Sequence, residues 1–360
     1  MLDNANKSSS YKYMSSGFEA NFGFAEQGAG SNARGDIATD TIGLGGISLK
    51  EQQLALSYGD SSIAFSILGL GYASAENQVL NQNPKPPYDN LPLAMAKQGG
   101  TNLALFSMWK DTAQGHNGHL MFGGVDKDKY SGNLATLPVQ ARDNGITAYD
   151  VTLQGVQVKG DLGLDASVKG PFNVVLDCGS SGSILSDEMA QPIFDKFGVT
   201  YFEANNSAQV DCAVGRSATT IDFEFDGVTI SAPIAAFVVR FGNDTFCSFG
   251  IVAAGKRRGL LGDNFLTSAY AVFDVSNNEI SLGQRKWAST REDIVVVPKE
   301  GVKAVISPTG PSTVPTPEPT TTGTDPAAAT TSKPGSASSL SWNGMVAFWL
   351  FASTCVILMV

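Results

Sequence analysis

The chain has 360 residues, which is enough for two lobes with substantial cores, and its formal net charge is -10 from 24 basic and 34 acidic residues. The acidic balance argues against nucleic-acid binding and is compatible with an acidic working environment. The 39 glycines, together with strong β-forming residues and regularly spaced turns, predict an all-β protein.

The first half of the chain contains a hairpin signal and an apolar pair that ends on glycine. The strand-like runs Phe18–Gly23 and Gly35–Ile42 flank a tip of small and polar residues, which predicts a hairpin. Farther along, Ile67-Leu68-Gly69 has an apolar pattern that returns later in the chain. The two histidines, His116 and His119, lie in a glycine-rich stretch typical of a turn, so we expect neither a Ser-His-Asp triad nor a metal site.

The most informative stretch for chemistry runs from Asn173 to Leu185. The apolar run Val174-Val175-Leu176 ends on Asp177, and a turn of small residues follows at 179–183. An apolar strand that ends in this way leaves the carboxylate at the edge of a core, where glycine permits a sharp turn and serine supplies local hydrogen bonds. Such a carboxylate can act as an acid or a base, although a strand that ends in an ordinary Asx-turn gives the same pattern.

A second stretch, Gly259–Leu266, repeats the apolar pattern at Leu260-Leu261-Gly262 and is followed by two strand-like runs. Together with the Asp177 loop, this order of motifs resembles the C-terminal lobe of pepsin-like aspartic proteases, in which an Asp-Thr/Ser-Gly loop lies below an apolar-apolar-glycine segment. The resemblance covers roughly residues 8–290. It implies a bilobal, all-β pepsin-like fold, with Asp177 as a catalytic residue. The catalytic loop would also contain Cys178, Gly179 and Ser180.

The same resemblance assigns roles to earlier and later residues. Phe22 and Gly23 would lie in the flap, the hairpin that closes over bound peptide, where the family usually has Tyr-Gly; an ordinary surface hairpin is the alternative. Ile67-Leu68-Gly69 would be the first-lobe counterpart of the later apolar motif. Cys212 and Cys247 stand where the family has a disulfide, whose closure would contribute roughly 3 to 4 kcal/mol, with two reduced thiols as the alternative.

Aspartic proteases need two carboxylates that share one proton across a bound water, as is well established for this family. If the first lobe kept the spacing between Asp177 and Leu260, the partner of Ile67 would lie before Met1, so we expect a first lobe that is incomplete at its N-terminal end. Three other carboxylates lack the strand-then-glycine-turn setting: Asp3, Asp40 and Asp60. We therefore name no second catalytic residue and expect little or no peptidase activity from the 360 residues as written.

Two departures from the family pattern keep a second class of function open. Phe22 lacks the hydroxyl of the usual tyrosine, and Cys178 replaces a hydroxyl residue that hydrogen-bonds across the two active-site loops in the family. A thiol is a weaker donor and acceptor, and a reactive thiol at Cys178 is a further alternative. These departures favour a non-catalytic, surface-anchored binding protein on a protease scaffold, whereas the missing signal peptide favours an aspartic-type endopeptidase that lacks its start. The family resemblance makes an aspartic-type endopeptidase the expected function and the binding protein the alternative.

The carboxyl end changes in composition. From about Val305 the chain is rich in Ser, Thr, Pro and Ala, which cannot build a core, and it ends in an uncharged apolar stretch at 344–360. This end resembles a GPI-attachment signal and the layout of GPI-anchored fungal (yapsin-like) members of the family, with a tail-anchored transmembrane helix as the alternative. The expected attachment region contains Gly335, Ser336, Ala337 and Ser338.

Four parts are thus expected: a first lobe at 1–145 with the flap, a second lobe at 146–296 with the Asp177 loop, a stalk at 297–343 and a hydrophobic tail at 344–360. The first residues contain no apolar signal-peptide region. We expect a monomer without a cofactor, attached through GPI to the plasma membrane or cell wall and acting on peptide or protein substrates. Three sequons are candidate glycosylation sites, namely Asn6, Asn205 and Asn243.

Overall fold

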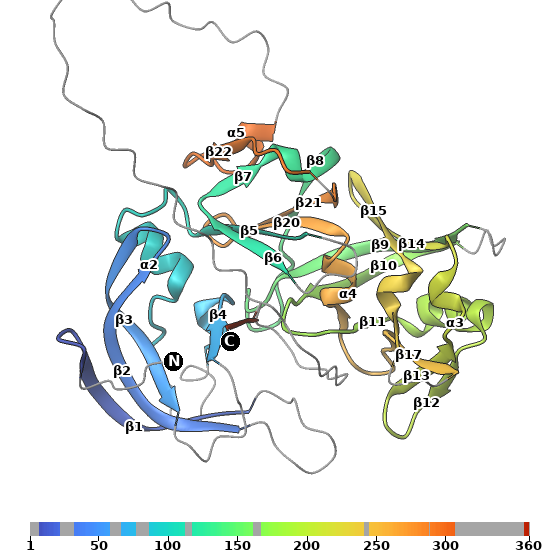
Figure 1. Ribbon diagram of the computed structural model, residues 1–360, viewed down its shortest axis with the longest axis horizontal. Coiled ribbons are helices and arrows are strands. Elements are labelled where there is room, and N and C mark those ends of the chain that lie inside the picture. The colour runs from blue at the N-terminus through green and yellow to red at the C-terminus, as the bar shows by residue number, and fades with distance from the viewer. Residues whose placement is uncertain are drawn as a thin grey trace, which may run out of the picture.

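The computed structural model describes residues 7–21, 32–57, 66–76, 86–111, 117–160, 167–240, 245–287, 289–306 and 356–359. Strands dominate these residues and the helices are short, which confirms the expectation of an all-β protein. Figure 1 shows the sheet of β1, β2 and β3 at one end of the molecule and α3 with β12 at the other, with a further sheet between them.

The amino-terminal sheet has three antiparallel strands, β1 (Lys12–Asn21), β2 (Asn32–Leu44) and β3 (Ile47–Ser57). Gly45 and Gly46 join β2 to β3 with φ values of 57° and 81°, a backbone conformation that glycine adopts without steric penalty. The buried Asp40 on β2 accepts hydrogen bonds at Oδ1 from the hydroxyls of Ser8 (2.8 Å) and Ser10 (2.6 Å), which tie the preceding segment to this sheet.

Next in the chain are the short strand β4 (Ser66–Gly69), η2 (Ala73–Ala75) and α2 (Leu91–Lys97). The side chain of Asn90 accepts from the Leu93 N–H and so caps the start of α2, where it satisfies a backbone donor that has no partner inside the helix. Among the described residues, β4 pairs with β23 (Val356–Met359) in an antiparallel ladder, and Figure 1 shows the carboxyl end beside β4.

A five-stranded sheet contains strands from both expected lobes. Its order is β6 (Gly118–Phe122), β5 (Leu105–Lys110), β20 (Ala269–Asp274), β21 (Glu279–Arg285) and β8 (Tyr130–Pro138). The late hairpin β20–β21 is thus inserted between strands from the first half of the chain. Beside it, β7 (Gly124–Asp126), which precedes η3 (Lys127–Lys129), pairs with β22 (Ile294–Val296). Val297 and Val302, ahead of α5 (Lys303–Ile306), are buried with Tyr270, so the packed part of the chain continues past residue 296.

The second lobe is built on a seven-stranded sheet that carries Asp177. The strand order is β15 (Val228–Pro233), β14 (Thr220–Phe225), β9 (Asp150–Lys159), β10 (Ser167–Leu176), β19 (Gly259–Leu261), β11 (Ser183–Leu185) and β18 (Ile251–Ala253). The helical elements around it are α3 (Asp187–Phe197), η4 (Val214–Arg216), η5 (Ile234–Phe237) and α4 (Asp263–Leu266). A four-stranded sheet completes the lobe, in the order β12 (Thr200–Phe202), β13 (Ser207–Asp211), β17 (Phe246–Phe249) and β16 (Val238–Val239).

The disulfide expected from the family resemblance is confirmed. Cys212 and Cys247 are bonded with an S–S distance of 2.04 Å, and both side chains are buried. The bond links the end of β13 to β17, so it fastens the four-stranded sheet internally. No helix within the described ranges is both long and apolar enough to cross a membrane.

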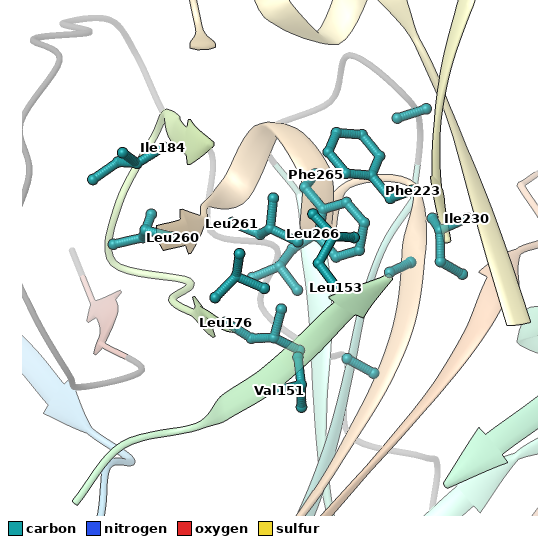
Figure 2. Packing of buried hydrophobic residues seen from close by; sticks show 14 of the residues in the cluster. Val151, Leu153, Leu176, Ile184, Phe223, Ile230, Leu260, Leu261, Phe265 and Leu266 are labelled. Atoms are coloured by element: carbon teal, nitrogen blue, oxygen red, sulfur yellow. The ribbon is translucent and has the colours of Figure 1, made fainter. Parts of the chain in front are cut away.

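One large apolar core runs beneath both halves of the molecule and supports the Asp177 strand. It includes Leu49 and Phe106 from the first half and Leu176, Leu261 and Phe265 from the second. Figure 2 shows Leu176, Leu261 and Phe265 gathered in the interior, where β10 and β19 end and α4 begins. The strands that end at the candidate site therefore have closely packed apolar neighbours.

Candidate active site

Asp177 is held at the end of β10 by hydrogen bonds to the strands on both sides. Leu176 N–H donates to the Tyr149 carbonyl at 3.0 Å, and Asp177 N–H donates to the Leu261 carbonyl at 3.1 Å. The strands β10 and β19 are parallel, with Val175 opposite Leu260. The two motifs that the sequence singled out are therefore adjacent, and the second one supports the backbone of the first.

The turn after Asp177 orients both carboxylate oxygens. Gly179 N–H donates to Oδ1 at 2.9 Å and the Ser180 hydroxyl donates to Oδ2 at 2.8 Å. This is the Asx-turn geometry that the simpler interpretation required, but the carboxyl group is also buried, with only 2% of Asp177 exposed. Burying an acidic group costs free energy that an ordinary turn residue in water does not incur. A buried carboxyl group held in one orientation can, however, act as an acid or a base.

Burial raises the pKa of Asp177 from 3.8 to about 6, although the hydrogen bonds from Ser180 and Gly179 act in the opposite direction. Desolvation disfavours the charged carboxylate, and the two donors favour it, so burial is the stronger effect here. No charged group contributes to this shift among the described residues. Asp177 can therefore exchange a proton in mildly acidic solution, as a general acid or base must.

Gly262 allows the Asp177 loop to lie directly against the start of α4. A Cβ at this position would lie 2.2 Å from the Gly182 carbonyl oxygen and 2.5 Å from that of Ser180. The close approach lets Asp263 N–H donate to the Ser180 carbonyl at 2.6 Å. The apolar-apolar-glycine motif thus requires glycine because no side chain fits between the two backbones.

A buried polar network beneath the loop was not predicted from the sequence. The Ser183 hydroxyl donates to Asn264 Oδ1 at 2.7 Å and accepts from Gly262 N–H at 3.2 Å, while Asn264 Nδ2 donates to the Gly250 carbonyl at 2.8 Å. These bonds tie the turn after Asp177 to α4 and to the segment before β18. The available signal was Asn264 directly before the apolar pair Phe265-Leu266, because a buried amide must find partners.

An ion pair connects the site to the first half of the chain. Lys110 Nζ, at the end of β5, lies 2.9 Å from Asp263 Oδ1 and 3.1 Å from Oδ2. Asp263 is the residue whose N–H contacts the Asp177 loop. The ion pair therefore links the five-stranded sheet, to which both halves contribute and which is called the shared sheet below, to the backbone that supports the loop.

Cys178 differs from the expectation of a thiol. Its side chain is disulfide-bonded and partly buried, and the bonded partner is not among the described residues. The alternative of a reactive thiol at Cys178 is therefore wrong for this structure, because a disulfide sulfur carries no ionisable proton.

Other predicted positions fall away from Asp177 or outside the described residues. Asn205 is exposed, and its side chain accepts a hydrogen bond from the Ser207 hydroxyl at 2.8 Å. His119 Nε2 lies 2.8 Å from Asp111 Oδ1, and the His119 ring stacks on that of Trp109. Both contacts join the ends of neighbouring strands and account for His119 structurally. The described residues contain no cluster of three metal-ligating side chains. The positions outside the described residues are Phe22, Gly23, Asn6, Asn243, His116, Asp3, Asp60, Gly335, Ser336, Ala337 and Ser338.

Comparison with known proteins places these features in a family context. The family profile described as eukaryotic aspartyl protease matches residues 3–285. The chain is 38% identical over 299 residues to "Probable aspartic-type endopeptidase opsB" of Aspergillus oryzae, which covers 81% of this chain and 60% of the relative. It is also 34% identical over 262 residues to "Secreted aspartic protease 8" of Candida albicans, covering 72% of this chain and 59% of the relative. The chain thus spans about 60% of the length of these curated relatives.

Proposed function

We propose that this chain, which belongs to the eukaryotic aspartyl protease family, carries one of the two catalytic carboxylates of an aspartic-type endopeptidase. The single observation that supports the role most strongly is the buried Asp177 carboxyl, which is fixed by donors on both oxygens and has a pKa raised to about 6. The substrates would be peptides or proteins, since hydrolysis of a peptide bond is the reaction named for the relatives.

The proposed chemistry needs one ionised and one protonated carboxyl group on opposite sides of a water molecule. The ionised group removes a proton from the water as it attacks the peptide carbonyl, and the protonated group donates to the carbonyl oxygen. Gly179 and Ser180 would keep Asp177 aimed at this water in either protonation state. Because no second carboxylate shifts the pKa of Asp177 among the described residues, we propose that turnover depends on a carboxylate from outside them.

The test compares Asp177→Asn with a matched buried carboxyl elsewhere in the fold. Asp274 is also buried at a strand end and accepts from the Asn277 N–H at 3.0 Å and from its side-chain amide at 2.8 Å. Cleavage of a mixed peptide library at about pH 3 to 6 should be abolished by Asp177→Asn but retained in Asp274→Asn. A transition-state peptide inhibitor of aspartic proteases is the control for contaminating peptidases.

The assay should use both the 360-residue chain and a longer form that supplies a second Asp-Thr/Ser-Gly loop. We expect inhibitor-sensitive cleavage from the longer form and little from the shorter one. Equal, inhibitor-sensitive cleavage by both forms would show that the described residues or their neighbours already contain the partner of Asp177. Cleavage that survives Asp177→Asn would refute the catalytic role.

A non-catalytic, surface-anchored binding protein is the second candidate, and Cys178 is the observation that favours it. Cys178 lacks the hydroxyl with which the family's residue hydrogen-bonds across the two active-site loops. A protein of this kind would bind the peptide inhibitor, as isothermal titration calorimetry can detect, while no form of it cleaved any peptide. Restoring the residue by Cys178→Thr in the longer form should then leave cleavage absent.

For location, we propose attachment through GPI at the outer plasma membrane or cell wall, in the layout of yapsin-like family members, and a monomeric state. The support is the Ser/Thr/Pro-rich stretch, the small residues at 335–338 and the uncharged apolar end. A phosphatidylinositol-specific phospholipase should release the protein from intact cells. Release by detergent alone, with residues 345–360 still attached, would instead support a tail anchor.

A further inference from the structure

The geometry points to Tyr149 as a positioning residue that fixes the Asp177 loop relative to the segment after β4, an inference that rests on the proposed function. Tyr149 lies immediately before β9 and is 1% exposed. Its main chain contacts the strand that ends at Asp177, and its side chain contacts the residue that follows Ile67-Leu68-Gly69.

The main-chain contact is to the catalytic strand. The Tyr149 carbonyl accepts the 3.0 Å hydrogen bond from Leu176 N–H, and Leu176 directly precedes Asp177. The next residue pair in the ladder is Val175 opposite Asp150. A displacement of the Tyr149 backbone would therefore move the end of β10, on which the Asp177 carboxyl is mounted.

The side-chain contact reaches across the molecule to the first half. The Tyr149 hydroxyl donates to the Leu70 carbonyl, which is buried. Leu70 directly follows Gly69, the last residue of Ile67-Leu68-Gly69, which is the counterpart of the motif that supports Asp177. One tyrosine thus connects the catalytic strand to the segment that corresponds to its support in the other half.

The ring of Tyr149 has little freedom to change this connection. Its centroid lies 4.8 Å from that of Phe273, 5.0 Å from that of Tyr72 and 6.2 Å from that of Phe106. Phe106 and Phe273 are directly paired on neighbouring strands of the shared sheet. The direction of the hydroxyl is therefore set by the sheet to which both halves contribute. Burial also raises the pKa of Tyr149 well above its ordinary value, so the hydroxyl stays a donor at any working pH.

The consequence for catalysis follows from the proton that two carboxyl groups must share. Sharing requires the groups to stay within hydrogen-bond reach of the same water, and a misplacement of about 1 Å can lower a rate roughly 100-fold. Removing the Tyr149 hydroxyl would leave the Leu70 carbonyl buried without its donor. The segment after β4 would then be less firmly held against the Asp177 strand.

The experiment compares Tyr149→Phe with Tyr270→Phe, since each variant keeps the ring and removes one hydroxyl. Tyr270 is 0% exposed, and its hydroxyl accepts from Asp126 N–H at 2.7 Å, away from both motifs. Hydrogen exchange followed by mass spectrometry should show faster exchange at 66–72 and 174–180 in Tyr149→Phe, but not in Tyr270→Phe. This measurement uses the full chain and needs no turnover.

In a form that cleaves peptides, Tyr149→Phe should lower kcat by roughly 10- to 100-fold with little change in KM, while Tyr270→Phe lowers the melting temperature alone. Incorporation of 4-aminophenylalanine at position 149, which restores a donor, should recover most of the rate. Equal exchange in the two variants, or an equal loss of kcat in both, would overturn the positioning role. If no form cleaves peptides, the proposed function fails and the exchange comparison still decides the role of Tyr149.

Discussion

Replacing Gly262 by alanine should disturb the Asp177 loop more than any other change of one methyl group near the site. The added Cβ would lie 2.2 Å from the Gly182 carbonyl oxygen and 2.5 Å from the Ser180 carbonyl oxygen, and both atoms belong to backbone that cannot rotate away. An ordinary van der Waals contact is about 3.5 Å, so one of the two backbones must move by about 1 Å. Overpacking of this kind costs about 1 to 3 kcal/mol of unfolding free energy.

The movement would reach the Asp177 carboxyl group through bonds already described. Asp263 N–H donates to the Ser180 carbonyl at 2.6 Å, and the Ser180 hydroxyl holds Asp177 Oδ2 at 2.8 Å. A shift of Ser180 by about 1 Å would lengthen both bonds beyond their useful range. We therefore expect a loss of activity of roughly 100-fold, in addition to the loss of stability.

Gly43→Ala is the matched control, because a Cβ at Gly43 would meet nothing within 4 Å and its backbone is compatible with alanine. Gly43→Ala should change the unfolding free energy by less than about 1 kcal/mol, and with either sign. Urea unfolding at a fixed acidic pH measures both variants, and peptide cleavage measures the longer form. Equal unfolding free energies for Gly262→Ala and Gly43→Ala would refute the steric explanation.

The remaining predictions concern pH, the link between the two halves and the disulfide. The unfolding free energy should fall as pH rises from about 4 to about 6, and Asp177→Asn should flatten this slope; an unchanged slope would contradict the buried-carboxyl explanation. Lys110→Met should lower stability by about 1 to 2 kcal/mol, because Asp263 is left partly buried without its partner, while Lys110→Arg should retain most of it. Thermal unfolding of both variants at the same salt concentration measures the difference, and an equal loss of stability in Lys110→Met and Lys110→Arg would argue against the ion pair. Replacing Cys212 and Cys247 together by serine should lower the unfolding free energy by about 3 to 4 kcal/mol, and urea unfolding with an unchanged midpoint would refute that estimate.

The sequence was sufficient for the site's central features because they are local and chemically restrictive. The apolar run before Asp177 and the glycine turn after it specify a strand end and a turn. Leu260-Leu261-Gly262 in turn predicts a buried strand that ends on a glycine, where two backbones can lie close together. The disulfide between Cys212 and Cys247 also followed from position, since the family has one there.

The supporting contacts could not be predicted because they depend on pairing between distant parts of the chain. The Tyr149 hydroxyl reaches a carbonyl 79 residues away, and Ser183 bonds to Asn264 across 81 residues. A tyrosine before a strand and a serine in a turn are ordinary in sequence, and only the folded structure reveals their partners. The shared sheet was missed for the same reason, because the pairing of β20 with β5 is not a local property.

The burial that suits Asp177 to acid chemistry also makes the fold depend on pH. Its folded-state pKa is raised from 3.8 to about 6, so the protonated group contributes stability that is fully present below the lower value and lost as pH rises through the higher one. The difference corresponds to about 3 kcal/mol, a large part of the stability of a typical protein. Burial likewise raises the pKa of Glu76, which follows η2 in the first half, to about 7. Because Glu76 is only half-buried, its contribution to the unfolding free energy is smaller than that of Asp177.

Both groups therefore act in the same direction, because burial is the main cause of each raised pKa. Moving from acidic to neutral solution would ionise two carboxyl groups that the fold desolvates, one beside the proposed reaction centre and one in the other half. The burial of Asp177 therefore makes the fold more stable in mildly acidic than in neutral solution, which is also the range in which its carboxyl group can exchange a proton.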